Sequence, residues 1–129
     1  MSEMDAIIHE FVQEGNDKAD LAERHLLQLE KDPSSRELLN EVFRVMHSIK
    51  GATSFLGFTK ICALTHTGES LLARLRDGGL ATSPEITTAL FSLLDTVRKL
   101  LSEIETTGHE GNGDYTALTN TLTRLQNSG

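Results

Sequence analysis

The sequence predicts an all-α protein, an up-and-down four-helix bundle with an additional short C-terminal fifth helix. Apolar residues recur every three or four positions along five stretches, which is the spacing of helices that bury one face. Short polar segments containing Pro or Gly separate these stretches, and helices joined by short loops favour antiparallel neighbours. We expect one domain, residues 1–129, because this length is typical of a single hydrophobic core.

The first helix is expected at about 2–31 and the second at about 34–56. Gly15 is the weak point of the first helix, because glycine is a poor helix former. Ser34 and Glu37 have the spacing of a capping box at the start of the second helix. The expected apolar stripes consist of Met4, Ile7, Ile8, Phe11, Ala19, Ala22, Leu26 and Leu29, and then of Leu38, Val42, Val45, Met46, Ile49 and Thr53. A helical wheel also turns the methyl group of Ala52 toward the core.

The remaining helices are expected at about 59–77, 83–106 and 114–127. Thr59 is the expected N-cap of the third helix, which follows a glycine stop at Gly57. The fourth helix is expected to begin with Ser83 as its cap and Pro84 in its first turn. A polar, glycine-rich connector then leads to the short fifth helix.

Composition excludes several classes of function. A net charge of −7 argues against binding nucleic acid, because surfaces that follow phosphates are rich in Lys and Arg. The longest apolar runs are far shorter than the roughly 20 residues that cross a bilayer, and the acidic start does not resemble a secretory signal. We therefore expect a cytoplasmic protein without a membrane role. The single cysteine, Cys62, is expected to be an ordinary packing residue.

The strongest candidate for chemistry is His47 in the second helix. On the helical wheel it lies about 140° from the centre of the apolar stripe, so its side chain is expected to be accessible. Lys50 lies three residues later on the same side. A neutral imidazole is a competent nucleophile toward phosphorus, and a nearby cation would offset the charge of a transferred phosphoryl group. Gly51 removes a side chain one turn from His47 and so leaves room for another backbone or a protein partner.

The third helix supplies candidate partners for the imidazole. A carboxylate that accepts a hydrogen bond from one ring nitrogen would fix the tautomer and leave the other nitrogen free to react. Glu69 flanks the apolar face of its helix at about 110° and can lean toward a neighbouring helix. His66 lies almost opposite that face, so helical spacing supports it less than Glu69.

Two other functions fit the same residues. A helical adaptor would need no reactive histidine, and an exposed His followed by Lys is common on solvated helix surfaces. A metal-binding bundle could use the His66 and Glu69 pair with His47, although all three lie off the apolar stripes. Metal content of the purified protein separates this last alternative from the others.

The sequence around these residues resembles a known family. The segment from Phe43 to Phe58 reads FRVMHSIKGATSFLGF, and the segment from Leu64 to Leu72 reads LTHTGESLL. Both resemble the histidine-containing phosphotransfer domain of CheA-type chemotaxis histidine kinases, as does ERHLL at residues 23–27. In that family a second glycine often follows the position of Gly51, whereas this chain has Ala52.

The resemblance implies a five-helix phosphoryl carrier. His47 would receive a phosphoryl group from the ATP-binding domain of a kinase and pass it to an aspartate of a response-regulator receiver domain. Lys50, His66 and Glu69 fall on positions that form the hydrogen-bonding network around the phosphorylated histidine. ATP and magnesium would be used by these partners, and no cofactor or metal is expected in this domain. The chain is expected to be a monomeric piece of a longer kinase.

Overall fold

The computed structural model describes residues 2–128. The helices in chain order are α1 (Glu3–Lys31), α2 (Arg36–Leu56), α3 (Thr59–Arg76), α4 (Pro84–Thr107) and α5 (Thr116–Gln126). Each predicted helix is present, and each boundary falls within two residues of its expected position. The expected domain limits, 1 and 129, lie outside the described residues.

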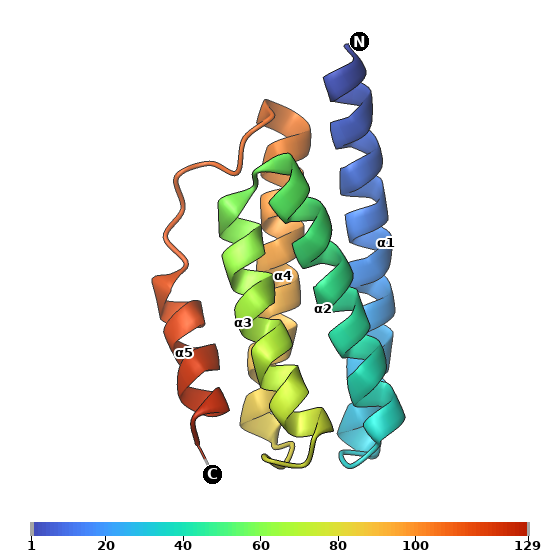
Figure 1. Ribbon diagram of the computed structural model, residues 1–129, viewed down its shortest axis with the longest axis vertical. Coiled ribbons are helices and arrows are strands. Elements are labelled where there is room, and N and C mark those ends of the chain that lie inside the picture. The colour runs from blue at the N-terminus through green and yellow to red at the C-terminus, as the bar shows by residue number, and fades with distance from the viewer. Residues whose placement is uncertain (1, 129) are drawn as a thin grey trace.

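Successive long helices run in opposite directions, as Figure 1 shows. α1 packs on α2 and α4, α2 packs on α3, and α3 packs on α4, so the four helices close around one core. α5 lies against α3 and α4 on the outside of the bundle. The predicted four-helix bundle with a short fifth helix is therefore confirmed.

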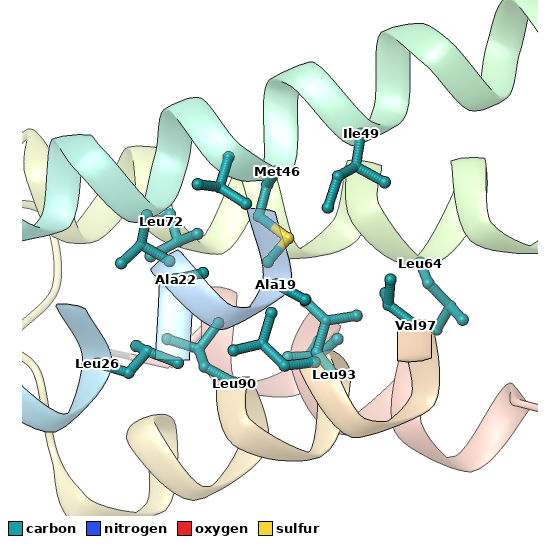
Figure 2. Close-up of a cluster of buried hydrophobic side chains, with 14 of the residues drawn as sticks. Ala19, Ala22, Leu26, Met46, Ile49, Leu64, Leu72, Leu90, Leu93 and Val97 are labelled. Atoms are coloured by element: carbon teal, nitrogen blue, oxygen red, sulfur yellow. The ribbon is translucent and has the colours of Figure 1, made fainter. Parts of the chain in front are cut away.

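The core is built from aliphatic side chains of all four long helices (Figure 2). Burial of such side chains is the main favourable contribution to folding. Fully or almost fully buried members include Ala19, Ala22, Leu26, Met46, Ile49, Leu64, Leu72, Leu90, Leu93 and Val97. Because Met46 and Ile49 turn inward, the opposite face of α2 is presented to solvent.

One expectation for α1 needs correction. Met4 and Ile7 are 56% and 47% exposed, because the first turns of α1 extend beyond the ends of the neighbouring helices (Figure 1). As expected, α1 continues through Gly15. Gly15 is buried, and a Cβ added there would lie 2.9 Å from a methyl carbon of Leu101, so this glycine allows close packing of α1 on α4.

The N-cap of α2 is Ser35 rather than the predicted Ser34. The backbone N–H of Ser35 donates to the Asp32 carbonyl at 3.1 Å, which closes a turn with Pro33 and Ser34 at its corners. This turn moves the helix start by one residue, and the Ser35 hydroxyl accepts from the Leu38 N–H at 3.2 Å. The predicted capping box with Glu37 is therefore wrong.

The N-terminus of α3 is capped from elsewhere in the chain. Thr59 is not the cap, and the N-cap position, Phe58, offers no side-chain acceptor. The carboxylate of Glu110 instead accepts from the Lys60 N–H at 3.1 Å and from the Ile61 N–H at 2.8 Å. The Lys60 ammonium in turn donates to the Gly111 and Gly113 carbonyls, at 2.8 Å each, so the connector between α4 and α5 is fixed to the start of α3.

The other helix ends follow the sequence. Ser83 accepts from the Ile86 N–H at 3.3 Å, with Pro84 in the first turn of α4. Gly57 ends α2 with a φ of 82°, a conformation that glycine adopts with little strain.

Near the C-terminal end of α2, one residue is not buried as the helical wheel predicts. Ala52 is exposed rather than turned toward the core, whereas Thr53 is buried as expected, and its hydroxyl donates to the Ile49 carbonyl at 3.0 Å. No helix within residues 2–128 is long and apolar enough to cross a membrane.

Candidate functional site

The candidate site lies on the solvent side of the seam between α2 and α3. His47 and Lys50 come from α2, one helical turn apart, and Glu69 comes from α3. These two helices are packed against each other and antiparallel, so the three side chains meet although 19 residues separate Lys50 from Glu69. All three are placed by helix backbone rather than by a loop, which gives them a defined relative geometry.

Glu69 occupies the centre of the site. The Lys50 ammonium donates to Oε1 of Glu69 at 3.1 Å and lies 2.9 Å from its Oε2. Nδ1 of His47 lies 3.4 Å from the same Oε2, slightly beyond the usual hydrogen-bond length. One carboxylate therefore contacts both the candidate nucleophile and the candidate cation.

The environment keeps Glu69 ionised. Burial raises the pKa of its carboxyl, but the hydrogen bonds and charges of Lys50 and His47 lower it by more, so the pKa lies below its ordinary value of 4.5. The Glu69 side chain is 15% exposed and that of Lys50 is 24% exposed, so this ion pair is only partly screened by water. An ionised Glu69 can accept a hydrogen bond from the Nδ1–H of His47.

His47 itself is open to solvent, with 65% of its side chain exposed. If Nδ1 carries the proton that faces Glu69, the lone pair of the imidazole lies on Nε2. Nε2 is then the nitrogen available for a bond to phosphorus. The arrangement suits nucleophilic chemistry with a large partner, because the reactive edge is not enclosed.

Gly51 lies beside His47 on the exposed face of α2. A Cβ added there would meet nothing within 4 Å. Packing inside the described part of the chain therefore does not require glycine at this position. We expected Gly51 to admit either another backbone or a protein partner. The first explanation is wrong for the described residues, and the second stays a prediction.

The structure does not bring His66 into this network. Its side chain is exposed on α3, one turn before Glu69, and takes part in none of the hydrogen bonds or ion pairs found in residues 2–128. The reason is its angular position, because the flanking Thr65 and Gly68 face the core and leave His66 pointing outward. A role for His66 stays a prediction that rests on the resemblance.

Sequence reasoning missed two residues next to the site. The ring of Phe43 stacks on the His47 imidazole with centroids 6.1 Å apart and an interplanar angle of 14°. The guanidinium carbon of Arg76 lies 4.3 Å from the centroid of the Phe43 ring. The i, i+4 spacing of Phe43 and His47 could have indicated the first contact. Arg76 comes from the other helix, so no local pattern indicates the second.

A metal centre is the remaining geometric possibility. Among residues 2–128, no three His, Cys, Asp or Glu side chains lie close enough together to hold a metal ion. His47 and Glu69 form a pair, and the third carboxylate or imidazole that a site would need is not beside them in this part of the chain.

Comparison with known proteins identifies the family. The model of the family described as "Hpt domain" matches residues 6–128. This chain belongs to the Hpt domain family. The match runs from the second turn of α1 to the end of α5 and includes the three residues that meet at the seam between α2 and α3.

The Hpt domain resembles parts of chemotaxis kinases. It is 32% identical over 127 residues to the sensor histidine kinase CheAY of Helicobacter pylori, which covers 98% of this chain and 16% of that protein. It is 34% identical over 105 residues to the chemotaxis protein CheA of Halobacterium salinarum, which covers 81% of this chain and 16% of that protein. The chain thus spans a small part of the length of these curated relatives.

A solved structure shows the same architecture. The phosphorylated P1 domain of CheA3 from R. sphaeroides, determined in complex with CheY6, superimposes on this Hpt domain with a TM-score of 0.87. The two share 27% sequence identity, and the match covers 95% of this chain and 96% of that one. The predicted resemblance to the CheA-type phosphotransfer domain is therefore confirmed.

Proposed function

We propose that this Hpt domain is a phosphoryl carrier in chemotaxis-type two-component signalling, with His47 as the residue that carries the group. The observation that supports this most directly is the contact of Glu69 with both His47 and Lys50 on an open helix face. Membership of the Hpt family and similarity to CheA proteins support the same function. The source of the phosphoryl group would be the ATP-binding domain of a kinase.

In the first step, the lone pair on Nε2 of His47 attacks the γ-phosphorus of ATP held by the kinase domain. The N–P bond forms as the bond from phosphorus to the bridging oxygen breaks, and ADP leaves with that electron pair. Positive charge that develops on the ring is shared through the Nδ1–H with the carboxylate of Glu69. The Lys50 ammonium, already 2.9 Å from that carboxylate, offsets the charge of the arriving phosphoryl group.

In the second step, a carboxylate oxygen of an aspartate in a receiver domain attacks the same phosphorus. The N–P bond breaks, and its electron pair returns to Nε2, which restores the neutral imidazole. The response regulator is proposed as the acceptor because the P1 domain of CheA3, a similar fold, was solved in complex with CheY6. His66 is proposed to contribute less than Glu69 or Lys50, since it takes part in none of the hydrogen bonds or ion pairs found in residues 2–128.

The domain is proposed to work without a cofactor or metal of its own. ATP and magnesium would belong to the kinase and regulator domains, and this chain would act as their substrate and carrier. We propose a cytoplasmic location, in keeping with the absence of a membrane-crossing helix in residues 2–128. We also propose that the isolated domain is monomeric.

The test is incubation with a chemotaxis kinase catalytic core and ATP, followed by mass spectrometry before and after mild acid. We expect one phosphoryl group on His47, which acid removes because the P–N bond is labile. His47→Gln should abolish labelling and leave the thermal midpoint almost unchanged, since surface substitutions usually alter stability by less than about 0.5 kcal/mol.

A matched control is His25→Gln, which changes a histidine of α1 whose Nδ1 lies 3.4 Å from Oε1 of Gln28. This variant should be labelled normally. Absence of labelling in the unmodified protein, under conditions that label a related domain, would contradict the carrier function and favour an adaptor. Stoichiometric zinc or iron in the purified protein would instead favour the metal-binding alternative.

A further inference from the structure

The His47 imidazole is in contact with a second side chain besides Glu69. Phe43 precedes it by four residues on α2, and their rings stack at 6.1 Å and 14°. Side chains of an α-helix lean toward its N-terminus, so the side chain of residue 47 naturally reaches over residue 43. The distance and angle lie within the range of favourable offset ring stacking.

This contact matters because Glu69 alone holds the imidazole loosely. The Nδ1 to Oε2 separation is 3.4 Å, and 65% of the His47 side chain is exposed. Exposed side chains change rotamer within nanoseconds unless packing restrains them. A flat ring on one face and a carboxylate at Nδ1 together restrain both the tilt and the rotation of the imidazole.

Phe43 is in turn covered by a residue from α3. The guanidinium of Arg76 lies 4.3 Å from the Phe43 centroid, a separation typical of cation–π contacts. Nε of Arg76 also donates to Oδ1 of Asp77 at 3.1 Å, and the Arg76 side chain is 27% exposed, so the guanidinium has a second partner beside the Phe43 ring. The half-buried Phe43 ring also packs on the core, so the core and Arg76 together restrain the ring that stacks on His47.

The two contacts form consecutive steps along one seam. Arg76 follows Glu69 by seven residues, which is about 10 Å along α3. Because α2 and α3 are antiparallel, this displacement leads from His47 back toward Phe43 on α2. Two residues of α3 therefore act on the His47 imidazole. Glu69 contacts Nδ1 directly, and Arg76 contacts the Phe43 ring that stacks on the imidazole.

We propose that Phe43 and Arg76 are positioning residues for phosphoryl transfer, which hold the His47 imidazole so that Nδ1 faces Glu69 and Nε2 faces the incoming phosphorus. The proposal rests on the carrier function proposed above and adds two residues to it. Neither residue forms or breaks a bond in the reaction. Both act through the orientation and tautomer of the imidazole.

The first test compares three variants of the whole chain: Phe43→Leu, Phe43→Tyr and the control Phe91→Leu. Phe91 is also a half-buried phenylalanine that packs on the core, but it lies on α4. Two quantities are measured, the ¹⁵N chemical shifts of the His47 ring and the rate of labelling by phosphoramidate, a small donor that needs no protein partner.

We expect Phe43→Leu to move the ¹⁵N shifts toward a mixture of tautomers and to slow labelling about threefold to tenfold, the range that one ring stack can account for. Phe43→Tyr keeps an aromatic ring, so its ¹⁵N shifts and labelling rate should stay close to those of wild type. Phe91→Leu should change neither the shifts nor the rate. Unchanged shifts and unchanged labelling in folded Phe43→Leu would overturn the proposal.

A second variant covers the case in which Phe43→Leu does not fold. Arg76→Gln changes a side chain at the surface and should shift the His47 ¹⁵N signals in the same direction, with a smaller loss of rate. The control Arg98→Gln removes an arginine that pairs with Asp20 at 2.8 Å on the other side of the bundle, and it should leave these signals unchanged. Identical spectra for wild type and Arg76→Gln would remove Arg76 from the proposal.

These measurements separate the two proposals. If the wild-type chain is labelled on His47 but Phe43→Leu matches it in both readouts, only the positioning role fails. If the wild-type chain is never labelled, the carrier function fails, and the ¹⁵N shifts still decide whether Phe43 and Arg76 orient the imidazole.

Discussion

Glu69 lies between a lysine and a histidine, and this position gives the carboxylate two separable effects. It neutralises Lys50 at 2.9 Å, and it contacts Nδ1 of His47 at 3.4 Å. The first effect acts on the stability of the α2–α3 seam, and the second acts on the tautomer of the imidazole. Labelling rates report the effect on the imidazole, and the free energy of unfolding reports the effect on the seam.

Glu69→Ala should slow phosphoryl acceptance by about tenfold or more, because the imidazole loses the acceptor that fixes its tautomer. His66→Ala should have a smaller effect, since His66 is exposed and takes part in none of the hydrogen bonds or ion pairs found in residues 2–128. Initial rates of labelling by a kinase core measure both. A larger loss for His66→Ala than for Glu69→Ala would show that the network seen between α2 and α3 is not the one used in the reaction.

The lowered pKa of Glu69 makes part of the stability depend on pH. A carboxyl whose pKa is lower in the folded than in the unfolded chain stabilises the fold above its ordinary pKa of 4.5. That contribution is lost as the pH falls through the folded-state pKa. Glu69→Gln should therefore be less stable than wild type at about pH 7, and the difference should shrink at about pH 3. Urea denaturation at both values measures it, and a difference that grows in acid would contradict the assignment.

At the scale of the element, α2 has a buried face that holds the bundle and an outer face that holds the site. Met46 and Ile49 are buried, while His47 and Gly51 on the same turns are exposed. A change on the outer face can therefore alter function without disturbing the core. Gly51 provides the clearest case.

Gly51→Ala should stabilise the protein by about 0.5–1 kcal/mol, because alanine is a better helix former and its methyl would meet nothing within 4 Å. The same variant should slow transfer to a receiver domain if a partner approaches closely here. Thermal denaturation and transfer assays test the two effects separately. Loss of stability would mean that the open space beside Gly51 is not present in solution.

The opposite result is expected for a glycine in α3. A Cβ at Gly68 would lie 2.4 Å from a methyl carbon of Leu93, where α3 and α4 approach closely. Gly68→Ala should therefore destabilise the protein by about 1–3 kcal/mol through overpacking. In a double-mutant cycle, adding Leu93→Ala should cost less in the Gly68→Ala background than in wild type, and strict additivity would contradict the contact.

At the scale of the whole molecule, sequence predicts what is local and periodic. The five helices and most of the core could be predicted because each stripe is set by residues three or four positions apart. The pairing of Lys50 with Glu69 could be predicted only in part. A helical wheel gives the angle of a side chain around its own helix, but not how far one helix is shifted along its neighbour. The contact of Arg76 with Phe43 depends on that offset and could not be predicted.

The errors have the same origin. Ser34 has the right spacing for a cap, but a turn from Asp32 to Ser35 moves the helix start. Met4 and Ile7 continue an apolar stripe beyond the point where other helices can cover it. The cap position and the exposure of these side chains depend on how neighbouring segments meet. The spacing of residues within one helix does not contain this information.

The cap of α3 by Glu110 also constrains the order in which the bundle can assemble. The acceptor lies 49 residues beyond the Ile61 N–H, so α3 lacks this stabilisation until α4 and the connector have docked. We expect the bond to form after the rate-limiting step of folding. Glu110→Ala should then speed unfolding and leave the folding rate almost unchanged, for a loss of about 0.5–2 kcal/mol typical of a helix cap. Stopped-flow kinetics with urea would measure both rates, and slower folding would mean that the connector docks early.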